Sequence, residues 1–247
     1  MTTSQTTEGS ATAASPARSL VARLVGVVFA PRATYADVVQ HPRWLGALLV
    51  VIVVSSATAA TFSSTEVGRN AILDQQISQS EAYGRHLTDA DIARMERIAP
   101  YFAYFGAAFP ALTLPLGALL VSGLAFAVFN AAMGSDAKFK QTFAVVTHSG
   151  AILALQTLFS TPLAYARGTL SSATSLAVFA PFLDDDSFLA RLLGGVDLFL
   201  LWWIISLAIG LAVLYRRRTG PVATTLIVVY VAIGVVVATV KTVLSGA

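Results

Sequence analysis

The chain has 247 residues, of which 56% are hydrophobic and 12% are charged. Soluble domains carry roughly 25% charged residues, so this composition excludes a soluble globular protein and predicts an integral membrane protein. The formal net charge is +3 and cysteine is absent, which excludes disulfides, thiolate nucleophiles and cysteine metal sites.

The N-terminal region has two parts. Residues 1–17 are mostly Ser, Thr and Ala and bury too little apolar surface to fold, so we expect a disordered cytoplasmic tail. The next run, RSLVARLVGVVFA, places Leu and Val on one helical face and Arg18 and Arg23 opposite them. We expect residues 18–43 to form a cytoplasmic interfacial segment whose amphipathic helix sets its arginines among anionic headgroups and ends at Pro31. A helix packed on the bundle is the alternative.

Apolar runs long enough to cross a bilayer follow. We expect five spans, at residues 44–62, 108–131, 143–165, 196–215 and 222–240. Pro110 and Pro115 predict an interfacial lead-in or a kink in the second span. The fold class is therefore an all-α integral membrane protein, a five-transmembrane-helix bundle with an N-terminal interfacial amphipathic helix.

The polar insert at residues 63–100 has its own helical signal. Thr88 and Asp91 form a capping-box pattern with Asp in place of Glu, and Ile92, Met95 and Ile98 then recur at helical spacing. We expect an amphipathic helix there, lying on the membrane or on the bundle.

Two short loops determine the expected orientation. The segment DAKFK at residues 136–140 and the run Arg216–Arg218 are both basic, and the positive-inside rule assigns them to the cytoplasm. The N-terminus is then cytoplasmic, the insert is extracytoplasmic and the C-terminus lies outside. Arg18, Arg23, Arg216, Arg217 and Arg218 are the expected basic residues at the membrane surface.

Asp197 is the acidic residue closest to an apolar run. In this topology it lies in the first turn of the fourth span, near the outer headgroups, and Arg216–Arg218 follow the other end. Both placements suit the helix dipole, so we interpret Asp197 as a helix cap and anchor. A buried polar contact with an arginine or a ligand headgroup is the alternative.

His148 and Gln156 are polar residues within the third span. An ionisable residue inside a membrane is a functional hypothesis by default, and a neutral His bonded to a carbonyl or hydroxyl of a neighbouring helix is the structural alternative. An amide such as Gln156 commonly holds two helices together. Asp197, His148 and Gln156 are thus the candidate functional polar residues.

Catalytic and cofactor motifs are absent from the sequence. It contains no H-E-x-x-H, G-x-S-x-G or P-loop pattern, and its three histidines lie in different segments. The basic residues follow the membrane surface and form no separate basic module. We therefore expect no enzymatic activity, no cofactor, no metal and no nucleic-acid partner.

Four stretches together resemble the Yip family, the Ypt-interacting membrane proteins and their prokaryotic relatives. They are FAPRATYADVVQHPRWLGALLV, HLTDADIARMERIAPYF, GSDAKFKQTFAVVTHSG and LLGGVDLFLLWWIISLAIGLAVL. The resemblance implies a five-span domain over residues 44–247 with a cytoplasmic N-terminus. Family members often have a proline in the third span, where this chain has Gly150 and Ala151. The resemblance therefore does not predict a kink at that place.

Eukaryotic Yip proteins associate with prenylated Rab GTPases, whereas the bacterial relatives are largely of undefined activity. We expect a bacterial inner-membrane protein without catalytic activity that organises or binds other membrane components. Its partners would be the lipid bilayer and a membrane protein or a second copy of itself. The alternative is a small transporter or channel whose polar path passes near His148, Gln156 and Asp197.

Overall fold

The structure is a computed structural model that describes residues 17–180, 182–183 and 187–244. The predicted tail therefore lies outside the described residues apart from Ala17. The described chain is helical and contains no strand. Its elements are α1 (Leu20–Phe29), α2 (Pro31–Gln40), α3 (Leu45–Ser64), α4 (Glu66–Ala82), α5 (Asp89–Ile98), η1 (Ala99–Tyr101), α6 (Phe102–Met133), α7 (Phe139–Ser149), α8 (Ala151–Arg167), η2 (Leu176–Phe179), α9 (Phe188–Gly194), α10 (Leu198–Leu214) and α11 (Thr219–Leu244).

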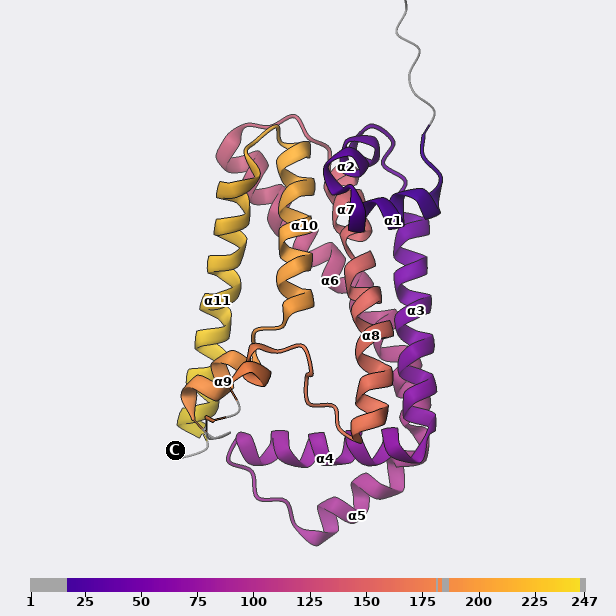
Figure 1. Ribbon diagram of the computed structural model, residues 1–247, viewed down its shortest axis with the longest axis vertical. Coiled ribbons are helices and arrows are strands. Elements are labelled where there is room, and N and C mark those ends of the chain that lie inside the picture. Colours follow the sequence, from indigo (N-terminus) through magenta and orange to yellow (C-terminus); the bar gives the residue numbers. More distant parts are fainter. Residues whose placement is uncertain (1–16, 181, 184–186, 245–247) are drawn as a thin grey trace, which may run out of the picture.

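The long helices run between two ends of the molecule (Figure 1). Helices α1 and α2 lie at one end with the α6–α7 and α10–α11 connections, and α4, α5 and α9 lie at the other. We call these the α1–α2 end and the α4–α5 end. Both basic loops that determined the expected orientation are therefore at the same end as the N-terminal helices.

Four helical stretches are long and apolar enough to cross a membrane: Leu45–Ser64, Asp89–Asn130, Phe139–Arg167 and Thr219–Val240. They coincide with four of the five predicted spans. The remaining prediction, the fourth span, falls on α10, an apolar helix of 17 residues that extends about 26 Å at 1.5 Å per residue. That length is slightly below the roughly 30 Å of a hydrocarbon core.

The third predicted span consists of two helices, because the helix is interrupted at Gly150, between α7 and α8. A Cβ atom there would lie 3.1 Å from the Thr147 carbonyl oxygen and 3.4 Å from Val51 Cγ2. The absence of a side chain thus allows α3 to approach the break. A helix interruption is present although the expected proline is not.

The helix of the second span begins earlier than residue 108, the start that was predicted. Pro110 and Pro115 lie inside α6, which continues from Phe102 to Met133 as one 32-residue helix. The residues expected to form an interfacial lead-in are the first turns of this helix. Helix α6 crosses the molecule obliquely behind the other spans (Figure 1).

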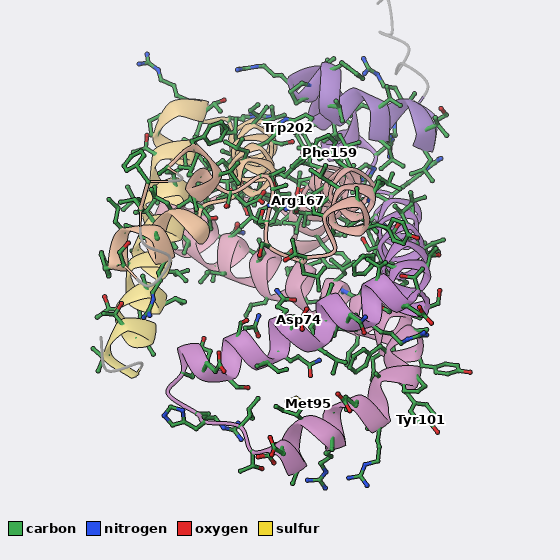
Figure 2. The ribbon with its side chains drawn as sticks, turned by 60° about the horizontal axis from the view of Figure 1, so that its bottom comes forward. Asp74, Met95, Tyr101, Phe159, Arg167 and Trp202 are labelled. Atoms are coloured by element: carbon green, nitrogen blue, oxygen red, sulfur yellow. The ribbon has the colours of Figure 1, made fainter. Side chains whose placement is uncertain are left out.

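The polar insert forms two helices, of which only α5 was expected. The predicted capping box is confirmed: Thr88 Oγ1 accepts from the Asp91 amide at 3.3 Å, and the Thr88 amide donates to Asp91 Oδ2 at 3.0 Å. Figure 2 shows α4, which carries Asp74, lying across the end of the bundle, and α5, which carries Met95, beyond it. No residue of α5 is buried, so its apolar face does not pack into the bundle.

The core lies where α2, α7 and α10 meet near the α1–α2 end. Tyr35 of α2 is fully buried, and its hydroxyl is 2.7 Å from Ser206 Oγ of α10. Gly210 lies beneath its ring: an added Cβ would be 3.0 Å from Tyr35 Cδ1 and 2.5 Å from Val145 Cγ1. The small residue at position 210 therefore permits a close three-helix contact.

Candidate functional site

Asp197 is the N-terminal cap of α10. Its Oδ1 accepts hydrogen bonds from the backbone N–H groups of Phe199 at 2.8 Å and Leu200 at 3.3 Å. These are donors that the first turn of a helix otherwise leaves unpaired. The interpretation of Asp197 as a helix cap is confirmed.

The same carboxylate holds the loop between α8 and α10. Oδ1 also accepts from Gln156 Nε2 at 3.0 Å, and Oδ2 accepts from Ser172 Oγ at 2.9 Å and from Thr174 Oγ1. We call Asp197, Gln156, Ser172 and Thr174 the Asp197 hub. All these donors are neutral, so the polar contact considered as an alternative is made with an amide and two hydroxyls in place of an arginine.

Backbone and tyrosine contacts extend the hub to α11. The Leu198 amide donates to the Thr174 carbonyl at 3.0 Å, and residues 175 and 197 form an isolated antiparallel bridge. Tyr230 of α11 accepts from the Asp197 amide at 3.3 Å and donates to the Gly195 carbonyl at 2.7 Å. The hub therefore joins α8, the following loop, α10 and α11.

His148 is buried in the last turn of α7. Its Nδ1 lies 2.7 Å from the Ala144 carbonyl oxygen, and since a carbonyl can only accept, Nδ1 carries the proton. Nε2 is then an acceptor, and this buried atom has no hydrogen-bond partner among the described residues. His148 is therefore bonded to a carbonyl, as the structural alternative expects, but this carbonyl belongs to its own helix and not to a neighbouring one.

Arg23 does not face lipid headgroups, which corrects the prediction. Its side chain is 2% exposed; Nε donates to Asp37 Oδ2 at 2.7 Å and Nη1 donates to the His41 carbonyl at 3.0 Å. The polar face of α1 points toward α2, whereas Val21, Val25 and Phe29 on its other face are exposed. The reason is Asp37, which offers Arg23 a buried ion pair that the local sequence pattern does not reveal.

The remaining predicted surface arginines are exposed. Arg18 Nη1 donates to Thr34 Oγ1 at 3.4 Å. Arg216, Arg217 and Arg218 follow α10, and their guanidinium groups make no hydrogen bond or ion pair within the described part of the chain. With a fourth arginine they surround a hollow of about 490 Å³, here called the arginine hollow, which is lined by Arg32, Ala36, Ala212, Val213, Arg216, Arg217 and Arg218.

Comparison with known proteins identifies the family. A family model described as the Yip1 domain matches residues 25–240, which is most of the chain. The chain belongs to the Yip family. The curated proteins and the solved structures that were compared give no match.

The Yip1 domain brings only two of the three candidate polar residues together. Gln156 bonds directly to Asp197, whereas His148 lies eight positions before Gln156, about 12 Å along a helix axis. A second hollow of about 160 Å³, lined by residues of α3, α6, α7, α8 and α10, is predominantly apolar. Neither hollow is lined by Asp197, Gln156 or His148.

Sequence reasoning missed several polar residues of this Yip1 domain. Asp37, Tyr35 and Tyr230 make the contacts described above, and Arg32 joins the arginine hollow. Their partners are distant in the sequence, so no local spacing indicates them. Arg32 follows Pro31 at the start of α2, and a basic residue at a predicted membrane surface was the one available signal.

Proposed function

We propose that this Yip family protein is a non-enzymatic membrane adaptor that binds other membrane components through its outer surfaces. One observation carries the proposal: the candidate polar residues Asp197, Gln156 and His148 line neither hollow. Asp197 and Gln156 are joined in the hub, and Tyr35 bonds to Ser206. A permease instead needs polar groups at several depths along one passage.

The surface available to a partner is apolar and lies chiefly on α6 and α11. Val228, Ile233 and Val236 of α11 are about 60% exposed, and nine large apolar residues of α6 are 47–73% exposed. Helix α11 contacts α10, α9 and α4, which leaves the rest of its length to lipid or to another helix. We propose that part of this face receives a membrane protein or a second copy of the chain.

Flux and crosslinking distinguish the adaptor from the transporter. The native chain has no cysteine, so Ile233→Cys introduces a single reactive thiol on the exposed face and Ala208→Cys introduces one in the core as a matched control. We expect crosslinked adducts in native membranes with the first variant and none with the second. Liposomes containing the protein should show no ion or solute flux above empty liposomes. Flux that disappears with His148→Ala, while the variant stays folded by gel filtration, would establish the transporter in place of the adaptor.

We also propose that the α1–α2 end faces the cytoplasm of a bacterial inner membrane, because both short basic loops lie there. A reporter active only outside the cytoplasm should be active when fused after Ala247 and inactive when inserted at residues 136–140. Activity in that loop would reverse the proposed orientation.

A further inference from the structure

The arginine hollow concentrates positive charge without compensation. Its four guanidinium groups are exposed and have no hydrogen-bond or ion-pair partner within the described ranges. No carboxylate lines the hollow, and nearby Asp37 is already paired with Arg23. The rest of its lining is Ala36, Ala212 and Val213, whose short side chains leave room for a group between the arginines.

The backbone at Arg216 is a second, independent sign of a site. Arg216 has a φ of 52°, and it is the only non-glycine residue with positive φ in the described chain. It follows the C-terminal cap of α10, and the Arg217 amide closes the turn on the Ala212 carbonyl at 2.8 Å. Glycine adopts this conformation at lower energy and is the usual residue there. The chain thus has arginine where helix termination alone favours glycine.

The position of the hollow indicates what binds. It lies between the end of α10 and the start of α2, and the candidate span in α11 begins at Thr219, directly after the last arginine. A group held there lies at the end of the molecule where this apolar span starts, which places it at the membrane surface. Guanidinium groups bind phosphate oxygens through paired N–H donors, and basic pockets between membrane helices hold anionic headgroups.

We propose that the arginine hollow binds the phosphate-bearing headgroup of an anionic membrane lipid, whose acyl chains lie along the apolar faces of the neighbouring helices. This inference requires only that the chain is embedded in a bilayer, and it holds whether or not the protein is an adaptor.

Native mass spectrometry of the full-length protein in detergent tests the site. The protein is titrated with phosphatidylglycerol and, separately, with phosphatidylcholine. We expect preferential retention of phosphatidylglycerol and a loss of affinity of about tenfold or more when four positive charges are removed. The test variant is R32Q/R216G/R217Q/R218Q, and the charge-matched control is R85Q/R94Q/R97Q/R167Q, which removes four exposed arginines elsewhere.

The single variant Arg216→Gly separates binding from folding. It removes one charge and also the strain of an arginine in the left-handed backbone conformation. The variant should therefore melt at the same or a higher temperature while binding phosphatidylglycerol more weakly. Equal retention of the two lipids, or an equal loss in the control variant, would overturn the proposal. So would displacement of the lipid by glycerol 3-phosphate or inorganic phosphate at equal concentration, because the site would then be one for a free phosphate.

Discussion

Replacing Asp197 tests whether the hub depends on the number of acceptors or on the charge itself. In Asp197→Leu the cap of α10 is lost, which costs about 1 kcal/mol. Gln156 Nε2 and Thr174 Oγ1 also lose their acceptor in partly buried positions, at about 1 kcal/mol each. Ser172 is exposed, so water replaces its bond. The expected loss of stability is about 3 kcal/mol, or roughly 6–12 °C in melting temperature.

Asp197→Asn should be much milder, with a loss below about 1 kcal/mol. The amide oxygen keeps the cap and the bond from Gln156. The amide nitrogen faces the hydroxyls of Ser172 and Thr174, which can turn and accept because a hydroxyl both donates and accepts. What is lost is the charge assistance of these bonds and the attraction to the helix dipole.

The assay is thermal unfolding of purified protein in one detergent at one scan rate, because irreversible unfolding makes the midpoint depend on rate. Asp136→Leu is the control, since Asp136 is exposed and has no hydrogen bond in the structure. It should change the midpoint little. An Asn variant as unstable as the Leu variant would refute the acceptor argument, and a Leu variant as stable as the native protein would refute the hub.

Three further predictions concern the α1–α2 end. Arg23→Gln should lower the free energy of unfolding by about 3 kcal/mol, because it leaves the carboxylate of a buried pair without its cation. The control Arg18→Gln changes an exposed position and should lower it by less than about 0.5 kcal/mol. Equal losses in chemical unfolding would contradict the buried ion pair. Gly210→Ala should lower the free energy of unfolding by about 1–3 kcal/mol through overpacking. In the control Gly123→Ala the added Cβ meets nothing within 4 Å, so stability should be unchanged or higher. A larger loss in Gly123→Ala than in Gly210→Ala would contradict the three-helix contact. Burial raises the pKa of Tyr35, so the folded state disfavours the phenolate. The free energy of unfolding should therefore fall as the pH rises above the ordinary pKa of tyrosine, and Tyr35→Phe should make this fall shallower. An unchanged slope would show that the phenol is not buried.

Periodicity, length and local spacing predicted much of the fold. The apolar runs indicated four of the candidate spans, the Thr88–Asp91 spacing predicted the cap of α5, and the position of Asp197 predicted the cap of α10. These features depend on residues within a few positions of one another, so the sequence displays them directly. Helix α4 was missed because its residues form a weakly amphipathic, mostly polar run.

Tertiary structure decided the environment of the polar residues. The amino-acid sequence places Arg23 on the polar face of α1, but packing against α2 turns this face toward Asp37 and away from lipid. The sequence likewise determined that Gln156 and Asp197 lie in two membrane segments, and only the fold joined them while leaving His148 apart. The physical reason is that a polar group in a membrane protein is stabilised by whichever partner the packing provides, and that partner can be far away in the chain.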